Sequence, residues 1–431
     1  VAFKSVKNIK SDKEYSSPYW LKEPHATGLF TVKDPTLIGK PENDPAIIVD
    51  ARVSVQGVSM TVAVPVVYKW TDPVKGELTR PFEVVPPVFI NFPQTVFIFR
   101  DQTPQTISVL VKSASSHRLK GNVKLELPAG WTSEPAVILF ELGKMNEEQT
   151  LMFKVTGGKE EFDGSIRATA DIEGQRYSNS IRQIQYDHIP IQTLLPPAKA
   201  RALRINISKV GSVIGYIKGA GDDIPVNLRN LGYEVWEMKD EEITASNLKR
   251  VDAVVLGIRA LNTNERIRFT MPTLLNYAKE GGTVVVQYNT NNDLEIDADK
   301  FSPYAITLSR DRVTQESSEV RILKPDHPAL NYPNKITVKD FEGWVQERGL
   351  YFPSTWSDSF DALLSMNDKG EPARNGSLLI AKYGTGHYVY TGLSFFRELP
   401  EGVPGAYKLF ANLVSLSKTK SPAPTKIKSK K

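Results

Sequence analysis

The pattern of apolar residues changes at about residue 209, and this change divides the chain into two kinds of fold. Before it, short β-branched runs alternate with turn residues, which indicates strands without helices. After it, buried-type strands alternate with helical segments, which indicates a parallel sheet covered by helices on both faces. A chain of 431 residues also exceeds what one hydrophobic core supports. The sequence therefore predicts a multidomain protein with N-terminal β-sandwich domains followed by a doubly wound, mostly parallel α/β sheet domain.

The first part is expected to hold two sandwich domains. Residues 1–85 contain about four or five strand-like runs, too few for a closed sandwich, so we expect a partial domain that is truncated on its N-terminal side. Residues 86–188 have a strand-like run about every ten residues, which is typical of an Ig-like sandwich. The runs are 95–99, 106–112, 121–127, 136–140, 148–155 and 165–172.

Proline-rich residues 189–208 are predicted to be a linker, and residues 209–417 the α/β domain. Residues 418–431 hold six lysines and no acid, and their Pro/Ser/Lys composition predicts a disordered tail. Strands are expected at 213–217, 233–237, 253–257 and 283–288, helices at 224–231, 272–279 and 404–416, and a hairpin at 378–391.

Composition excludes several classes of function. The net charge of +5 comes from the lysine tail, which leaves the rest of the chain near −1 and argues against specific nucleic-acid binding. No apolar run has the length of a transmembrane helix. The absence of cysteine excludes disulfides and a thiol nucleophile, and fits an exported protein. The five histidines are scattered, so no metal site and no cofactor is predicted for this chain.

Residues 326–352 mix charged and aromatic side chains without helical or strand periodicity. This composition is typical of a structured connection at a pocket mouth, where loops on a rigid sheet present polar groups to a ligand. The alternative is a surface connection whose aromatics fill a small core. Under the first interpretation, Trp344, Arg348 and Tyr351 contact the ligand.

The same stretch supplies the weak candidates for acid and base chemistry. His327 follows a carboxylate that can orient it as a general base, although an Asp-His-Pro turn also occurs as a purely structural loop start. The candidates are Asp326, His327, Asp340 and Glu347.

Polar residues follow the predicted parallel strands, at the edge where open α/β sheets bind ligands. Asp222 and Asp223 follow the first strand, Arg259 the third and Asn289 the fourth. The two aspartates have a competing interpretation, because carboxylates at a helix start cap free amides and repel an anion. Further along, Arg310 and Arg312 suit a carboxylate, a phosphate or a uronic acid, unless they pair with Asp311 and Glu316.

Segments of this sequence resemble three kinds of known protein. The element Leu127-Pro128-Ala129-Gly130-Trp131 resembles Ig-like accessory domains beside sugar-processing enzymes. The strand order after residue 209 resembles class I glutamine-amidotransferase-like (ThuA-like) domains, but the nucleophilic cysteine of that superfamily is missing, so the comparison extends to the fold alone.

A resemblance over nearly the whole chain is to the C-terminal region of large bacterial PIG-L-family (LmbE-like) deacetylases. The strings that carry it are SSPYWLKEPH (16–25), YKWTDPVKGELTRPFEVVPP (68–87), KGAGDDIPVNLRNLGYEV (218–235), TLSRDRV (307–313), DFEGWVQERGLYF (340–352) and TGLSFFRELPEGVPGAYKLFANL (391–413). The family implies export to the periplasm or outside the cell, and a separate zinc-dependent deacetylase domain with a His-Pro-Asp-Asp motif. Here His327-Pro328 is followed by Ala329-Leu330, so no metal ligand is carried over.

The expected function is therefore that of a non-catalytic accessory region that binds a glycan or N-acetyl-sugar derivative, or positions it for a deacetylase domain of the same protein. One alternative is hydrolase or isomerase activity on a sugar derivative in the α/β domain, so whether the chain is itself an enzyme stays open. The other is a scaffold or assembly role.

Overall fold

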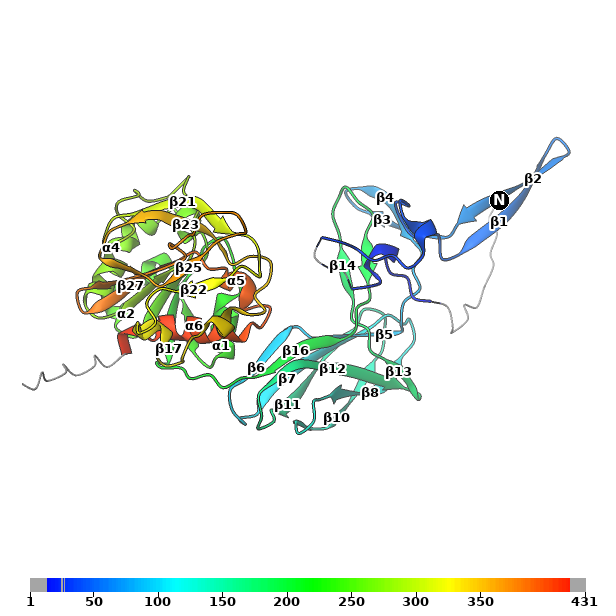
Figure 1. The fold of residues 1–431 in the computed structure, drawn as a ribbon. Coiled ribbons are helices and arrows are strands. Elements are labelled where there is room, and N and C mark those ends of the chain that lie inside the picture. Colours follow the sequence, from blue (N-terminus) through cyan, green and yellow to red (C-terminus); the bar gives the residue numbers. More distant parts are fainter. Residues whose placement is uncertain (1–13, 25, 27, 419–431) are drawn as a thin grey trace, which may run out of the picture. The chain divides into compact units, whose positions relative to one another are not determined.

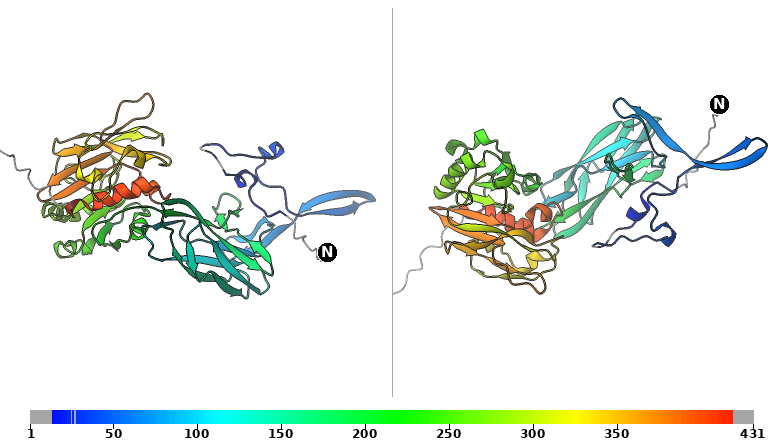
Figure 2. Two further views of the ribbon diagram at one scale, coloured as in Figure 1. Left: turned by 60° about the horizontal axis from the view of Figure 1, so that its bottom comes forward. Right: turned by 90° about the horizontal axis from the view of Figure 1, so that it is seen from above.

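The structure, a computed structural model, describes residues 14–24, 26 and 28–418. The lysine tail predicted at 418–431 lies outside the described residues except for Lys418. The chain divides into two compact units, Val1–Thr95 with Pro104–Thr156 and Ser165–Ala200, and Val96–Thr103 with Gly157–Gly164 and Arg201–Lys431. The predicted fold class is confirmed, since β-sandwich sheets precede a mixed, mostly parallel α/β sheet (Figures 1 and 2).

The N-terminal β-rich part is built of strands and short 3₁₀ turns. Its elements are η1 (Tyr19–Leu21), η2 (Pro35–Leu37), β1 (Ile48–Val55), β2 (Val58–Pro65), β3 (Val67–Asp72), β4 (Gly76–Pro81), β5 (Val88–Asn91), β6 (Val96–Phe99), β7 (Gln105–Ser113), β8 (Leu119–Glu126), β9 (Thr132–Glu134), β10 (Val137–Leu142), β11 (Glu148–Thr156), β12 (Phe162–Ile172), β13 (Gln175–Tyr177), β14 (Arg182–Ile184), β15 (Gln192–Leu194) and β16 (Lys199–Arg204).

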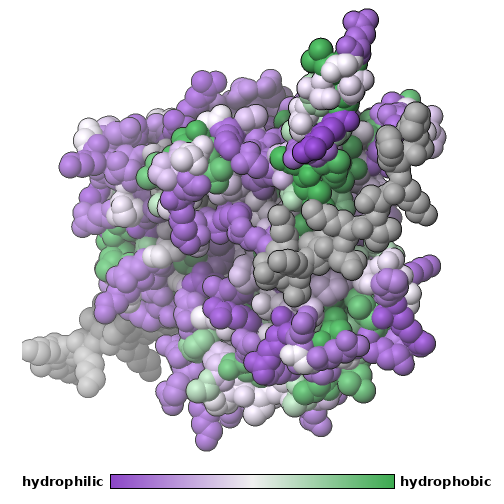
Figure 3. Space-filling model, turned by 90° about the vertical axis from the view of Figure 1, so that its right-hand side faces the viewer, coloured by the Kyte–Doolittle hydropathy of each residue, from purple (hydrophilic) through white to green (hydrophobic). Residues whose placement is uncertain are grey.

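Strands β1 and β2 form an amphipathic hairpin. Cross-strand partners such as Val53 and Met60 point to the same face of an antiparallel pair. One face is therefore wholly apolar; it consists of Val49, Ala51, Val53, Val55, Val58, Met60, Val62 and Val64. This face is open to solvent, with Val53 42% and Met60 51% exposed. Figure 3 views the molecule from the side where the hairpin lies in Figure 1 and shows hydrophobic surface among hydrophilic side chains.

The Ig-like region has a core formed by alternating side chains. One sheet has the order β5-β7-β11-β9, and a second contains β10, β8 and β12 in that order, with β13 on β12. Along β7, Ile107, Val109 and Val111 are fully buried, while the residues between them are partly exposed. This period of two is the one that the sequence shows. Trp131 is 8% exposed and belongs to the core.

The α/β domain follows β16. Its elements are β17 (Val213–Ile217), α1 (Ile224–Asn230), β18 (Glu234–Glu237), η3 (Asp240–Glu242), α2 (Ala245–Leu248), β19 (Ala253–Leu256), α3 (Ala260–Thr263), α4 (Ile267–Lys279), β20 (Thr283–Val286), β21 (Ile306–Val313), β22 (Val320–Ile322), η4 (Pro328–Leu330), η5 (Val338–Phe341), β23 (Gly349–Trp356), β24 (Phe360–Ala362), β25 (Leu364–Met366), β26 (Leu378–Tyr383), β27 (Gly386–Thr391), α5 (Phe395–Glu398), α6 (Pro404–Val414) and η6 (Leu416–Lys418).

The central sheet of this domain has seven strands in the order β18-β17-β19-β20-β27-β26-β24. The first five are parallel, and β26 and β24 are antiparallel additions at one edge. Successive valines of one strand face opposite layers. Val285 packs in the layer that contains α1 and α6, whereas Val284 and Val286 pack in the layer that contains α2 and α4. This arrangement explains why β20 is apolar at every position after Thr283.

Several elements differ from the sequence expectation. Residues 189–208, predicted as a linker, contain β15 and β16. Helix α4 starts five residues earlier than expected and contains Pro272, because Ile267, Met271 and Leu274 continue one buried stripe. Strands β21 to β25 lie in a region where no element was predicted. Among the described residues, no helix has the length and hydropathy to cross a membrane.

Candidate functional site

The candidate site lies at the carboxyl ends of β19, β20 and β27, which are neighbours in the central sheet. Arg259 follows β19, Tyr288 follows β20, and α5 follows β27 with Phe396 and Arg397. Ligands of open α/β sheets bind at this edge, because the loops after parallel strands converge there.

The turn that carries Arg259 has a strained backbone. Arg259 is in the left-handed region, with φ of 56° and ψ of 23°, directly before α3. Its amide donates a hydrogen bond of 2.8 Å to the carbonyl of Tyr288. A side chain in this conformation costs about 1 kcal/mol, and such strain is concentrated at ligand sites. Tyr351, with φ of 52°, is a second residue of this kind.

Aromatic rings form the centre of the site. The rings of Tyr288 and Tyr351 are stacked, and Phe396 lies 5.2 Å from Tyr288 between ring centroids. Burial raises the pKa of Tyr288, while the charges of Arg259 and Arg397 lower it. These charges therefore lie within electrostatic reach of the Tyr288 hydroxyl.

A cavity of about 440 Å³ adjoins Tyr351. It is lined by Arg310, Arg312, Glu347, Leu350 and Tyr351. The antiparallel pair of β21 and β23 brings these segments together, although 35 or more residues separate the arginines from the other three in the sequence. The carboxylate of Glu347 is held by Arg397 at 2.8 Å. The structure thus assembles four of the predicted site residues around one cavity.

Trp344 and Arg348, predicted as ligand contacts, are not among the residues that line this cavity. Trp344 is 3% exposed, packs on Phe341 and Phe395, and donates from Nε1 to a backbone carbonyl. Arg348 is 5% exposed and donates to the carbonyl oxygens of Ser318 and Phe341. Their buried positions match the alternative interpretation, in which part of this stretch fills a core.

Asp222 and Asn289 also have internal roles. Asp222 accepts hydrogen bonds from the Tyr216 hydroxyl and from the amides of Ile224 and Ile258, so it ties the first strand end to the third. Asn289 is fully buried; it accepts from the amide of Leu261 and donates to a backbone carbonyl.

Asp223 is the N-cap residue of α1, without a side-chain capping bond. Its carboxylate at the helix start opposes an anion there.

The candidate acid and base groups are not brought together. Burial lowers the pKa of His327 and also that of His387, which stands at the start of β27, and the nearby His327 lowers the pKa of His387 further. Glu347 lies beyond the other end of that strand, near Tyr288. The six residues of β27 span about 17 Å between these ends.

The two aspartates among these candidates have no catalytic arrangement either. Asp340 is engaged by the amide and hydroxyl of Thr337 and by Lys408, so its carboxylate fixes η5 in place. Asp326 is exposed at the surface before η4. The structure therefore does not bring the four candidate groups together. Across the described residues, no group of three His, Asp or Glu side chains is placed to hold a metal ion.

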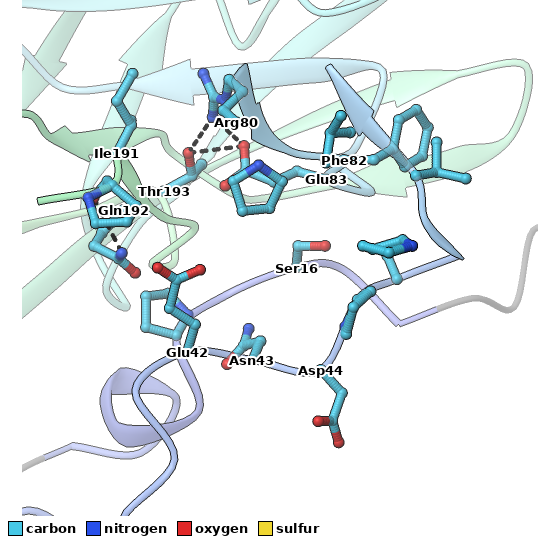
Figure 4. A pocket seen from close by; sticks show the side chains of 18 of the residues that line it. Ser16, Glu42, Asn43, Asp44, Arg80, Phe82, Glu83, Ile191, Gln192 and Thr193 are labelled. Atoms are coloured by element: carbon cyan, nitrogen blue, oxygen red, sulfur yellow. Dashed lines mark hydrogen bonds and ion pairs between the residues drawn. The ribbon is translucent and has the colours of Figure 1, made fainter. Parts of the chain in front are cut away.

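A second cavity, of about 380 Å³, lies in the N-terminal β-rich part (Figure 4). On one wall, Arg80 is paired with Glu83, and Thr193 hydrogen-bonds to both. Glu42, Asn43 and other residues of the opposite wall are labelled in Figure 4. The Glu83 carboxylate already neutralises the guanidinium of Arg80. This cavity therefore offers a ligand less free positive charge than the cavity at Arg310.

Sequence reasoning missed Tyr288, Leu350, Phe396 and Arg397. The signal for Tyr288 was its position at the end of a predicted strand next to Asn289. The signal for Phe396 and Arg397 was their position directly after the last parallel strand, at the ligand-binding edge of the sheet.

No protein-family model and no curated protein matches the chain. Distant matches among solved structures are to Ig-like, MSP-like and PapD-like β-sandwich domains. A Caenorhabditis elegans MSP family member, WR4, is 11% identical with a TM-score of 0.17, covering 27% of this chain and 98% of that one. A PapD-like domain of human CEP192 is 10% identical with a TM-score of 0.19, covering 32% and 99%. Escherichia coli α2-macroglobulin, from domain MG7 to the C-terminus, is 18% identical with a TM-score of 0.18, covering 27% and 17%.

Proposed function

We propose that the α/β domain binds a sugar derivative at the cavity beside Tyr351, and that the chain acts as a non-catalytic accessory region of an exported PIG-L-family deacetylase. The observation that carries the binding proposal is the convergence of Arg310, Arg312 and Tyr351 on one cavity at the carboxyl edge of a parallel sheet. Stacked tyrosines beside cationic side chains suit a ring with polar substituents.

Binding without chemistry is favoured by the arrangement of the charged groups. Glu347, the carboxylate at the cavity, is 15% exposed in its side chain and is ion-paired with Arg397. The ion pair occupies this carboxylate, so it is not free to hydrogen-bond a substrate group as a general base must. His327 is at the opposite end of β27, so a hydrolase or isomerase mechanism that uses both groups has no support.

The link to a deacetylase rests on the six sequence strings and their common order along the chain. In this proposal the cavity holds a segment of a glycan while a separate zinc-dependent domain removes an acetyl group from it. Export follows from the same resemblance and agrees with the absence of cysteine.

The test is calorimetric titration of the full chain with a panel of neutral, N-acetylated and acidic oligosaccharides. Tyr351→Ala is expected to weaken binding at least about fivefold, because ring-stacking contacts of this size contribute about 1–3 kcal/mol. Tyr186→Ala is the matched control, since Tyr186 is 61% exposed and remote in the sequence from the residues that line the cavity beside Tyr351. Failure of every glycan to bind, or equal loss in both variants, contradicts the proposal.

A further inference from the structure

The guanidinium groups of Arg310 and Arg312 lack the partners that their neighbours in the sequence suggest. Asp311 pairs with Arg374 at 2.9 Å. Glu316 accepts a hydrogen bond of 2.8 Å from the amide of Gln346. In the part of the chain that the structure describes, no carboxylate forms an ion pair with Arg310 or Arg312. The explanation that these arginines serve internal ion pairs is therefore excluded for the described residues.

Both arginines face the same cavity, because they are two residues apart on β21 and both line it. The one carboxylate in the lining, Glu347, is already balanced by Arg397. The cavity thus carries two uncompensated positive charges. Arg259, which is also exposed and has no ion pair among the described residues, lies near Tyr288 on the neighbouring strand end.

The lining combines two anion-binding side chains with an aromatic ring face. A guanidinium presents two parallel N–H donors, which match the two oxygens of a carboxylate. Tyr351 supplies an apolar ring face next to these donors, and its stacking on Tyr288 holds that ring in place. A volume of about 440 Å³ accommodates one or two sugar rings, whereas an inorganic anion leaves most of it empty.

We infer that the cavity is selective for a sugar residue that bears a carboxylate, with Arg310 and Arg312 binding the carboxylate and Tyr351 packing on the sugar ring. This inference rests on the proposed function, since it names the class of ligand for the same site. It assigns Arg310 and Arg312 to charge recognition and Tyr351 to ring recognition, and the two roles are separable by experiment.

The experiment compares two probes that share one sugar backbone, one with free carboxylates and one with those carboxylates esterified. The full chain is titrated with trigalacturonate and with its methyl ester, at low salt and at 0.5 M salt. Trigalacturonate is expected to bind about tenfold tighter at low salt, as two charge-assisted contacts at an exposed site, each giving at most about fivefold, together predict. High salt is expected to reduce this preference and leave the affinity for the ester unchanged.

The variants Arg310→Gln and Arg312→Gln are expected to lower the affinity for trigalacturonate to that for the ester, with thermal unfolding unchanged. Arg250→Gln is the matched control in the same domain, because Arg250 stacks on Trp236 away from the cavity residues. Glucose 6-phosphate and inorganic phosphate are the probes that distinguish a carboxylate site from a general anion site.

Each outcome either supports or overturns the inference. Preference for trigalacturonate that both glutamine variants abolish supports it. Equal binding of the acid and the ester overturns it and leaves sugar binding intact, whereas tighter binding of glucose 6-phosphate assigns the arginines to phosphate instead. Absence of binding by every sugar overturns the proposed function together with the inference.

Discussion

The rings of Tyr288 and Tyr351 lie nearly parallel, with an angle of 10° between their planes and 6.0 Å between their centroids. Tyr288 ends a parallel strand of the central sheet, whereas Tyr351 belongs to the β21/β23 pair. This contact therefore joins the sheet edge to the strand pair that carries Arg310 and Arg312, and it fixes the position of the cavity lining.

Trp344 and Tyr351 are expected to respond to substitution in opposite ways. Trp344→Ala leaves a large void in a buried aromatic cluster and is expected to cost about 3–5 kcal/mol of stability. Tyr351→Ala is expected to cost far less stability and to lose ligand affinity. Chemical denaturation and titration of both variants check this. A folded Trp344→Ala protein with unchanged stability and lost binding contradicts the burial of the indole.

Strain at Arg259 predicts an order of stability between two variants. Arg259→Gly relieves the left-handed backbone, whereas Arg259→Ala retains a Cβ and the strain, so the glycine variant is expected to be more stable by about 1 kcal/mol. Both variants lack the guanidinium and are expected to weaken binding of an acidic sugar equally. Thermal unfolding of the pair is the measurement, and an alanine variant as stable as the glycine variant refutes a left-handed Arg259.

Glu398 predicts a dependence of stability on pH. Burial raises the pKa of Glu398 to about 8, although hydrogen bonds from Val345 and Ser394 oppose the rise. The folded protein thus holds a proton that the unfolded chain releases above its ordinary carboxyl pKa of about 4.3. The free energy of unfolding is therefore expected to fall, by a few kcal/mol at most, as the pH rises from about 4.3 to about 8, and to level off above.

Glu398→Gln is expected to remove this dependence of unfolding free energy on pH, while Glu265→Gln, at an exposed position, leaves it unchanged. Unfolding in denaturant at pH 5, 6, 7, 8 and 9 measures how the free energy of unfolding depends on pH. A slope that persists in Glu398→Gln assigns the proton to another group.

Because the apolar face of the β1/β2 hairpin is exposed to solvent, we expect it to tolerate a charged side chain. Val53→Asp is expected to change the free energy of unfolding by less than about 0.5 kcal/mol, because Val53 is 42% exposed. Val109→Asp, at a fully buried position of β7, is expected to cost at least about 4 kcal/mol. An equally large loss for Val53→Asp means that the face is covered in solution.

Local sequence patterns predicted a strand well where both of its faces are buried. β17 was predicted with its observed ends, because five consecutive residues without a charged or amide side chain are typical of a central strand. Helix α4 was predicted too short, because Pro272 is a common first residue of a helix and its position inside this one depends on buried contacts. The strand pair β21/β23 was missed, because its register has bulges and its pairing is between distant segments.

For the site, the amino-acid sequence by itself determined which chemical groups are present: arginines without cysteine, tyrosines near strand ends, and a sheet edge that collects them. It did not determine which of them face a ligand. Trp344 and Tyr351 are seven residues apart, yet one is in the core and the other lines a cavity. Arg310 and Arg312 differ from Arg348 only in what surrounds them. Burial and pairing are properties of segments that meet in space, so only the tertiary structure decided them.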